Sequence, residues 1–202
     1  MKVALIGATG NAGSRILEEL LRRGHQVMAI VRNPERVPEK TGVTAKKGDV
    51  LDAASLAELV QGHDALISSV HFTASDPHKL IAAARASGVK RYLVVGGAGS
   101  LEVAHGVRLI DTPDFPAQYK NEASAGAAFL ELLRGVHDLD WTFLSPSALF
   151  IAGERTGKFR LGTNQLLATD KGSSISFEDY AIALVDELEH PKHSRQRFTV
   201  GY

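Results

Sequence analysis

The sequence predicts a single α/β domain built on a doubly wound parallel sheet, with helices on both faces of the sheet. An apolar run from Val3 to Ile6 opens the chain and has the length and β-branched content of a fully buried strand. Similar runs alternate with segments of helical periodicity along the rest of the chain, which is typical of parallel sheets. The 202 residues suit one domain, and no linker, internal repeat or low-complexity tract divides them.

Three glycines follow the first strand, at Gly7, Gly10 and Gly13. Apolar residues at helical spacing then run from Ile16 to Leu21, and Gly24 is placed to end the helix. A strand, a glycine-rich turn and a helix in this order make up the Rossmann-like dinucleotide site. There the first glycine allows a sharp turn, the second lets a pyrophosphate approach the backbone, and the third lets the helix pack on the strand. The sequence therefore favours a dinucleotide site over a turn that binds nothing.

The second predicted strand, His25 to Val31, ends beside basic residues. Arg32 stands at its tip, no acidic residue occurs before Glu35, and Arg36 is a second arginine. At this position of a βαβ unit an acid binds the ribose 2′-hydroxyl of NAD, whereas an arginine accommodates the 2′-phosphate of NADP. We therefore predict that the protein prefers NADP(H) to NAD(H). The alternative is that Arg32 is a solvated loop charge.

The third and fourth predicted strands, Gly42 to Lys47 and Asp64 to Val70, lead into further candidate residues. Asp49 follows the third strand at the edge where parallel sheets bind ligands, but capping of its own loop is an equally good reading. Asp52 is the predicted cap of the next helix. Small serine side chains end the fourth strand, which leaves room for a cofactor. His71 comes next, as a proton donor or as an ordinary surface group.

A helix is predicted from Asp76 to Ser87, with proline at its first position and glycine after its end. The fifth strand, Val89 to Val95, runs into a tract of small residues from Gly96 to Ser100. Such a tract indicates close approach by a ligand or by another part of the backbone.

Residues 101–119 contain glycine and proline residues that prevent a long helix. A loop of this length in a compact domain is usually functional, so we expect a lid or substrate wall over the cofactor cleft. The substrate-side elements are expected at about 101–120 and 147–177. The remaining predicted elements are a helix at 122–134, a strand at 141–144, a hairpin or loop at 153–162, a strand at 174–177, a helix at 178–189 and a strand at 197–200.

Composition limits the kinds of partner that we expect. The chain has no cysteine, which excludes disulfides, thiolate nucleophiles and cysteine-ligated metals. Lysine plus arginine equals aspartate plus glutamate at 23 each, so neither nucleic acid nor an anionic membrane is the expected partner. No apolar run approaches the roughly 20 residues of a membrane span. The first strand begins at Lys2, which leaves no room for a signal peptide, so we expect a cytoplasmic protein.

Several motifs together resemble those of the atypical short-chain dehydrogenase/reductases. Within them the chain is most similar to the NAD(P)H-binding group that contains NADH-flavin reductases and biliverdin reductase B, and the similarity runs its full length. The motifs that carry it are Gly7-Ala-Thr-Gly10-Asn-Ala-Gly13, Arg32, Gly48-Asp-Val50, Leu139-Asp-Trp-Thr-Phe-Leu-Ser-Pro146, Gly153-Glu-Arg-Thr-Gly157 and Ile175-Ser-Phe-Glu-Asp-Tyr-Ala181.

This resemblance implies a set of cofactor contacts. They are Gly7, Thr9, Gly10, Asn11, Ala12 and Gly13 on the pyrophosphate, Arg32 on the 2′-phosphate, Asp49 and Val50 by the adenine, Ser69, Val70, Gly96 and Gly97 along the ribose and nicotinamide, and Pro146, Ser147 and Ala148 at the carboxamide.

The chain departs from the superfamily at the catalytic pair. Related enzymes carry Tyr-x-x-x-Lys on the helix before the sixth strand, and here those slots fall at 122/123 and 126/127, where neither residue type occurs. The nearest tyrosine, Tyr119, has Ala123 as its fourth follower. Reduction of an isolated carbonyl needs a proton delivered to the developing alkoxide. A conjugated acceptor spreads that charge, so a dedicated acid is less necessary and water can supply the proton.

The sequence therefore predicts an NADPH-dependent oxidoreductase that passes hydride to a planar, conjugated acceptor such as a flavin. Aromatic candidates for the acceptor wall are Phe72, Phe115, Tyr119 and Phe150. The alternative is a redox sensor that binds NADP(H) without turnover and acts through a protein partner. A sugar-nucleotide epimerase is disfavoured, because few residues remain after Pro146 for a substrate domain. The catalytic residues stay unassigned, and a homodimer stays open.

Overall fold

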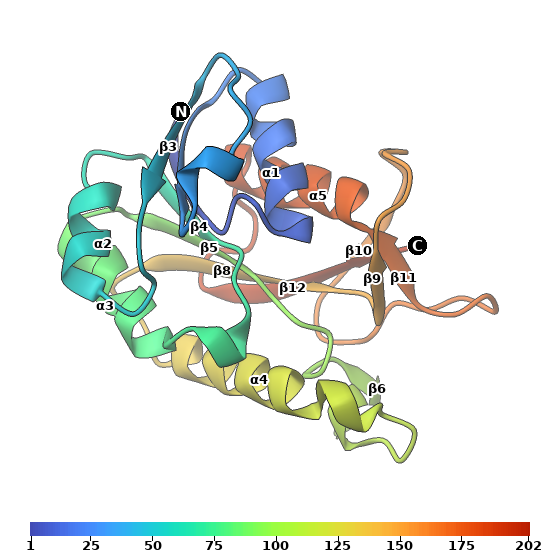
Figure 1. The fold of residues 1–202 in the computed structure, drawn as a ribbon. Coiled ribbons are helices and arrows are strands. Elements are labelled where there is room, and N and C mark those ends of the chain that lie inside the picture. Colours follow the sequence, from blue (N-terminus) through green and yellow to red (C-terminus); the bar gives the residue numbers. More distant parts are fainter.

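The computed structural model describes all residues, 1–202, and is built around an eight-stranded sheet (Figure 1). The strands lie in the order β10-β12-β8-β5-β4-β1-β2-β3. All neighbours are parallel except β10 and β12. The strands are β1 (Lys2–Ile6), β2 (Gln26–Val31), β3 (Val43–Lys47), β4 (Ala65–Ser68), β5 (Arg91–Val95), β8 (Asp140–Pro146), β10 (Arg160–Gly162) and β12 (Gln196–Gly201).

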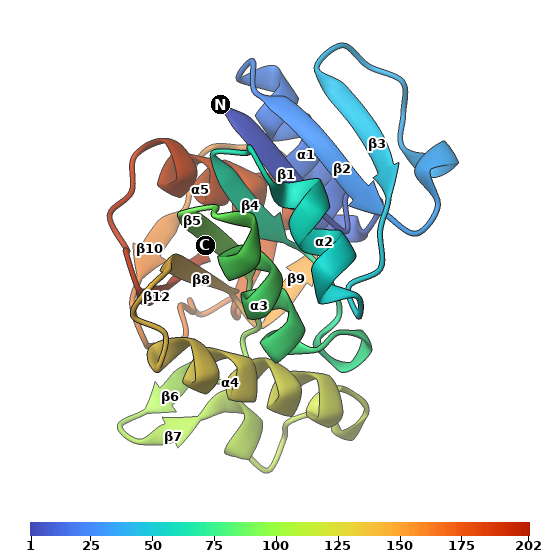
Figure 2. The ribbon, with the colours of Figure 1, turned by 90° about the vertical axis from the view of Figure 1, so that its left-hand side faces the viewer.

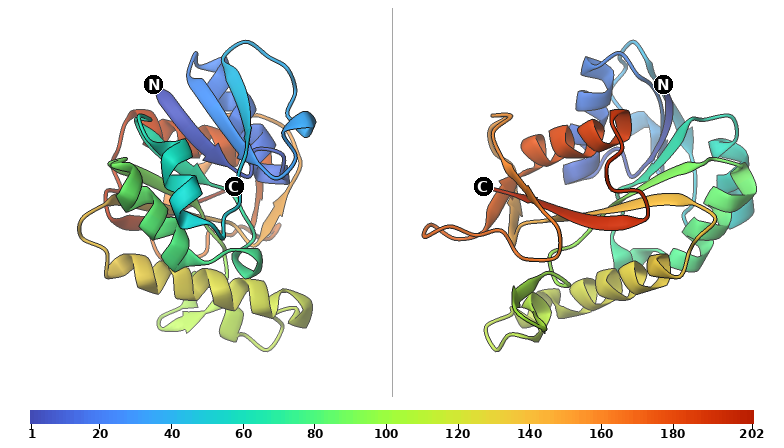
Figure 3. Two further views of the ribbon diagram at one scale, coloured as in Figure 1. Left: turned by 60° about the vertical axis from the view of Figure 1, so that its left-hand side comes forward. Right: turned by 180° about the vertical axis from the view of Figure 1, so that it is seen from behind.

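Helices cover both faces of this sheet, which confirms the predicted doubly wound α/β class. Helices α1 (Asn11–Arg22) and α5 (Phe177–Glu189) lie on one face, and α2 (Ala53–Val60), α3 (Pro77–Ser87) and α4 (Lys120–Arg134) on the other. Figure 3 shows α5 and α4 on opposite sides of the sheet. Side chains of β1 alternate between the two layers: Val3 and Leu5 join the core under α1 and α5, whereas Ala4 and Ile6 join the core under the other three helices. No helix is long and apolar enough to cross a lipid bilayer.

The order of the strands positions the candidate site. From β1 the chain proceeds outward through β2 to β3, then returns to the other side of β1 and proceeds through β4, β5 and β8. Ligands of open α/β sheets bind where the strand order reverses in this way, outside the carboxyl ends of the strands. The reversal here lies between β1 and β4.

The predicted helix boundaries are set by local chemistry. Asp52 accepts a hydrogen bond from the Ser55 amide, and Asp76 accepts one from the His78 amide, so both predicted caps are confirmed. Gly88 ends α3 with a φ of 74°, a left-handed conformation that favours glycine.

Three short strands differ from the predicted pattern. Residues 101–119 hold a small hairpin, β6 (Glu102–Ala104) and β7 (Val107–Arg108), which lies beside α4 in Figure 2. Strand β9 (Leu149–Ile151) was not predicted and pairs with β11 (Ser174–Ser176) in a second, two-stranded sheet. Because each strand has only two or three residues, none shows a recognisable period in the sequence. That the hairpin covers the cofactor cleft stays a prediction.

Candidate functional site

The predicted cofactor residues gather along one edge of the sheet, where the parallel strands end. The Gly7–Gly13 turn follows β1, Arg32 follows β2, and Asp49 and Val50 follow β3. On the other side of the reversal, Ser69 and Val70 follow β4, Gly96 and Gly97 follow β5, and Pro146 ends β8 with Ser147 and Ala148 behind it. The predicted residues therefore follow six separate strands at one edge of the sheet.

The three glycines of the first turn play different roles. Gly7 has a φ of 81°, and a Cβ there would lie 2.0 Å from the Ser69 carbonyl oxygen. A Cβ at Gly13 would lie 2.1 Å from the Gly7 carbonyl oxygen. At Gly10 the nearest atom would be 3.4 Å away, an ordinary contact. Packing of the protein therefore requires the first and third glycines, whereas the space beside Gly10 is open to a ligand.

The helix that follows this turn begins without a side-chain cap. Gly10 is its N-cap residue, its first turn holds no acidic residue, and the amides of Asn11, Ala12 and Gly13 have no protein acceptor. Free N–H groups and the helix dipole attract an anion at such an end. The three amides without an acceptor and the open position at Gly10 together fit a pyrophosphate.

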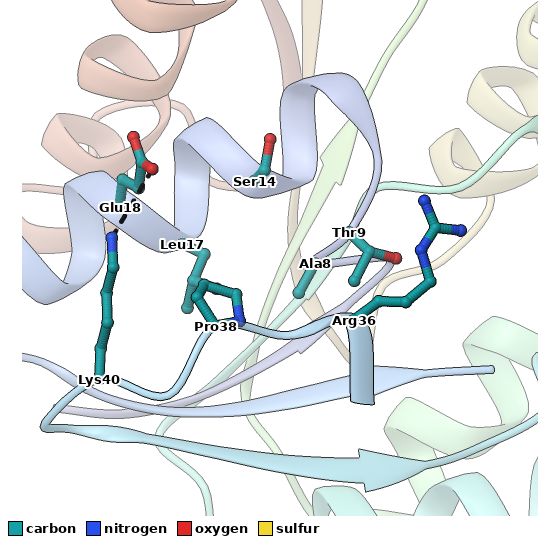
Figure 4. A pocket seen from close by; sticks show the side chains of 8 residues that line it. All are labelled: Ala8, Thr9, Ser14, Leu17, Glu18, Arg36, Pro38 and Lys40. Atoms are coloured by element: carbon teal, nitrogen blue, oxygen red, sulfur yellow. Dashed lines mark ion pairs between the residues drawn. The ribbon is translucent and has the colours of Figure 1, made fainter. Parts of the chain in front are cut away.

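A pocket of about 120 Å³ lies next to this turn, between α1 and the segment after β2 (Figure 4). Arg36 reaches into it beside Thr9, and no carboxylate pairs with its guanidinium. Lys40, in contrast, lies 3.8 Å from Glu18. Arg32 is exposed at the end of β2 and is also unpaired. The sequence singled out both Arg32 and Arg36 after this strand, and the structure places Arg36 at the pocket and leaves both guanidinium groups without a carboxylate partner.

Asp49 makes the loop contact that the sequence left open. Its Oδ1 accepts a hydrogen bond of 2.9 Å from the Leu51 amide, so this oxygen caps the turn between β3 and α2. The residue is exposed and its other oxygen has no partner. Contact of Asp49 and Val50 with an adenine stays a prediction.

The edge formed by β4 and β5 is tightly packed. Val70 would contact a Cβ at Gly7 at 3.2 Å, so the end of β4 rests on the first glycine turn. A Cβ at Gly96 would lie 2.4 Å from the Phe143 ring, and one at Gly97 would lie 3.4 Å from the Phe72 ring. Packing alone accounts for glycine at position 96, and cofactor contact at both positions stays a prediction.

A buried tyrosine that the sequence analysis did not single out holds the next pair of strands. The Tyr180 hydroxyl donates to the Leu144 carbonyl at 2.7 Å and accepts from the Gly96 amide at 3.3 Å. The same amide donates to the Leu144 carbonyl at 2.8 Å. Burial raises the pKa of Tyr180, which keeps the hydroxyl neutral. Tyr180 lies within the motif 175–181, which carries part of the family resemblance. Membership of that motif was the one feature of the sequence that pointed to this residue.

The three residues at the end of β8 differ in accessibility. Pro146 and Ser147 are buried, and the Ser147 hydroxyl donates to the Val200 carbonyl at 3.1 Å. A Cβ at Gly201 would collide with that hydroxyl at 2.1 Å. Ala148 is exposed. Ser147 therefore contributes to packing beneath the edge, and its contact with a cofactor stays a prediction.

Glu122 is one of the two residues, 122 and 123, at which the tyrosine slot of related enzymes is predicted to fall. Its carboxylate accepts hydrogen bonds from the Phe72 amide at 2.7 Å and from the Thr73 amide and hydroxyl at 3.0 and 2.7 Å. Burial acts to raise the pKa of Glu122, but these donors outweigh it and hold the pKa below its ordinary value of 4.5. The ionised carboxylate of Glu122 therefore links α4 to the turn after β4 through these hydrogen bonds. The sequence located the slot but not this role.

Two of the four aromatic candidates, Phe72 and Phe150, pack in different layers of the protein. Phe72 packs on Phe129 and Phe143, with ring centroids 6.2 Å from each, beside the core under α4. Phe150 packs on Phe177 and Tyr180 beside the core under α5, on the other face of the sheet. Phe72 and Phe150 therefore pack on opposite faces of the sheet, and an acceptor wall that includes Phe115 and Tyr119 stays a prediction.

Comparison with known proteins places this geometry in a family. The chain is 44% identical to the uncharacterized protein YwnB of Bacillus subtilis, over 99% of this chain and 98% of that protein. A solved structure from Streptococcus pneumoniae, provisionally named an NADH-flavin reductase, is 40% identical with a TM-score of 0.86, over 100% and 99% of the two chains. One from Bacteroides thetaiotaomicron, provisionally named an epimerase, is 41% identical with a TM-score of 0.95, over 100% and 96%. Residues 7–191 match the family model described as NAD(P)H-binding, and the chain belongs to this NAD(P)H-binding family.

Proposed function

We propose that this protein is an NADPH-dependent oxidoreductase that transfers hydride to a planar, conjugated acceptor such as a flavin. The observation that carries the proposal is the combination of an uncapped α1 N-terminus, an open position beside Gly10 and two unpaired arginines at the end of β2. NADPH, when bound, supplies the hydride.

In this proposal the residues of the crevice bind and orient the cofactor. The amides of the α1 first turn hold the pyrophosphate, and Arg32 and Arg36 bind the 2′-phosphate. The edge of β4, β5 and β8 then receives the nicotinamide, because the cofactor extends across the reversal of strand order. Tyr180 holds Gly96 and Leu144 in register beneath it.

The acceptor class rests on two supports. No tyrosine and lysine pair stands on α4, so an acceptor that disperses its own negative charge is the best match to the site. The name of the Streptococcus pneumoniae structure, at 40% identity over nearly the whole of both chains, agrees with a flavin. The epimerase name of the other structure is the less favoured reading for this chain.

A second candidate is a sensor that binds NADP(H) without turnover and acts through a partner protein. The engagement of Glu122 with the turn after β4 favours it, because a tethered carboxylate stands where related enzymes keep a reactive hydroxyl. A sensor would bind both redox forms of the cofactor and distinguish between them.

The test is oxidation of NADPH, followed at 340 nm, with FMN, riboflavin, a quinone and biliverdin offered in turn. Steady turnover with one of them supports the oxidoreductase and identifies the acceptor class. Tight NADPH binding in calorimetry with no turnover on any acceptor supports the sensor. Lack of NADPH binding contradicts both.

A further inference from the structure

His71 is placed at the centre of the proposed reaction edge. It follows Val70, which rests against the Gly7 turn, and precedes Phe72, whose ring lies against Gly97. Its backbone therefore bridges the turn that we assign to the pyrophosphate and the strand end that we assign to the nicotinamide. The imidazole is 85% exposed, so it projects from this edge rather than into the core.

One carboxylate from another element faces this imidazole. The Nδ1 atom of His71 lies 3.4 Å from Oε1 of Glu122, on α4. No other charged side chain lies within ion-pair distance of it. A carboxylate beside Nδ1 favours the proton on that nitrogen and leaves Nε2 as the outward-facing atom.

Other proton donors at this edge are less suitable. Glu122 is held ionised by three donors, so it is an acceptor. Tyr180 is completely buried with its hydroxyl already in use, and Ser147 is also completely buried. His71 is the accessible side chain at this edge of a type that serves as a general acid.

We propose that His71 is the proton donor of this protein and that Glu122 is a positioning residue that orients its imidazole. The inference rests on the proposed oxidoreductase function. Bound NADPH would supply a hydride, which is one proton with two electrons; the acceptor would be reduced by two electrons and become anionic, and the cofactor would be left as NADP⁺. The Nε2–H bond of the His71 imidazolium breaks as that proton joins the reduced acceptor, and water then reprotonates the imidazole.

The first test compares His71→Gln with the wild-type protein, and uses His78→Gln, an exposed histidine on α3, as the matched control. We expect kcat to fall at least about tenfold in His71→Gln, because positioned acids contribute about 10²- to 10⁴-fold. The dissociation constant for NADPH and the melting temperature should stay unchanged. Added imidazole should restore part of the rate in His71→Ala, which a purely structural histidine would not allow.

The second test addresses Glu122 without any cofactor. In ¹⁵N spectra of the neutral imidazole, the His71 resonance, identified by its loss in His71→Gln, should show a proton on Nδ1 in the wild-type protein. In Glu122→Gln it should shift toward the Nε2–H form that an unconstrained histidine side chain favours. The kcat of His71→Gln/Glu122→Gln should equal that of His71→Gln alone, because Glu122 acts through the histidine.

The outcomes separate this inference from the function on which it rests. If the wild-type protein turns over no acceptor, the oxidoreductase proposal fails and the donor role fails with it. If the wild-type protein turns over an acceptor and His71→Gln keeps its full kcat, the donor role alone is overturned. An Nε2–H form in the wild-type protein would overturn the role of Glu122.

Discussion

Arg155 donates two hydrogen bonds to Glu19, a residue 136 positions earlier in the chain. Its Nε lies 2.9 Å from one carboxylate oxygen, and its Nη2 lies 2.8 Å from the other. The Glu19 side chain is only 3% exposed, and Arg23 donates to the same carboxylate at 2.8 Å. The Arg155–Glu19 contact therefore holds the segment between β9 and β10 against α1. This segment, 152–159, has no regular secondary structure of its own.

This contact makes the protein sensitive to acid. Burial acts to raise the pKa of Glu19, but the hydrogen bonds from Arg155 and Arg23 outweigh it and place the pKa below its ordinary value of 4.5. A carboxyl with a lowered pKa contributes stability that is complete above about pH 4.5 and is lost as the pH falls through its folded pKa.

Glu19→Gln should lower the free energy of unfolding at pH 7 by about 2 kcal/mol, because it leaves charged donors without their acceptor. The difference from wild type should shrink below pH 4.5. Urea unfolding at several pH values measures it. Glu58→Gln, on the exposed surface of α2, is the control. A constant difference at all pH values would contradict the expectation.

The glycine turn allows folding and binding to be separated. Gly13→Ala should destabilise the protein by about 2 kcal/mol or more, because the added Cβ meets a backbone carbonyl at 2.1 Å. Gly10→Ala should cost less than about 1 kcal/mol and yet weaken NADPH binding, because its Cβ occupies the space that we assign to the pyrophosphate. Thermal unfolding and calorimetric titration distinguish them. Unchanged NADPH affinity in a folded Gly10→Ala protein would refute the pyrophosphate assignment.

How far the sequence predicted this structure depends on the range of each interaction. The caps at Asp52 and Asp76 and the end of α3 at Gly88 are local, and the sequence located them. The motif also predicted that Gly10 leaves room for a ligand and that Gly13 allows close packing of the helix. The atoms around each glycine, such as the Gly7 carbonyl oxygen 2.1 Å from a Cβ at Gly13, are seen only in the structure. Strand β9 has three residues and depends on pairing with β11, 25 residues away at Leu149 and Ser174.

The candidate site shows the same limit. The sequence found Arg32 and the empty tyrosine slot, since both are read from position within a known unit. It did not predict that Glu122 reaches His71, because the two lie on different elements and no pattern relates them. The proposal that His71 is a proton donor rather than a surface histidine therefore rests on a contact seen only in the structure.

Cofactor preference follows from the two arginines after β2. Arg36→Ala should raise the dissociation constant for NADPH about tenfold, the equivalent of about 1.4 kcal/mol, because a charge-assisted contact to phosphate is lost. The constant for NADH should stay nearly unchanged, since NADH has no 2′-phosphate. Arg134→Ala, on α4, should change neither constant. If Arg36→Ala weakened the binding of NADPH and NADH by the same factor, the arginine would not recognise the 2′-phosphate.

Tyr180→Phe provides the sharpest test of the β5 and β8 edge. The substitution keeps the ring, so only the hydroxyl contacts with Leu144 and Gly96 disappear. The direct bond between Gly96 and Leu144 at 2.8 Å remains, so we expect a loss of about 1 kcal/mol and a melting temperature lower by about 2–4 °C. Tyr92→Phe is the matched control, because it also removes a buried hydroxyl contact, at 2.9 Å from the Ser68 hydroxyl, but one that touches no backbone group of this edge.

The two variants should therefore lose similar stability and differ in cofactor binding. Without the two hydrogen bonds of the Tyr180 hydroxyl, the backbone at Gly96 should fluctuate more. NADPH would then have to order this backbone on binding, and the entropy lost in doing so lowers its affinity. We expect the dissociation constant to rise about threefold in Tyr180→Phe, or about 0.6 kcal/mol, and to stay constant in Tyr92→Phe. Equal affinity in both variants would mean that the nicotinamide does not rest on this edge. In that case Tyr180 would serve the packing of α5 alone.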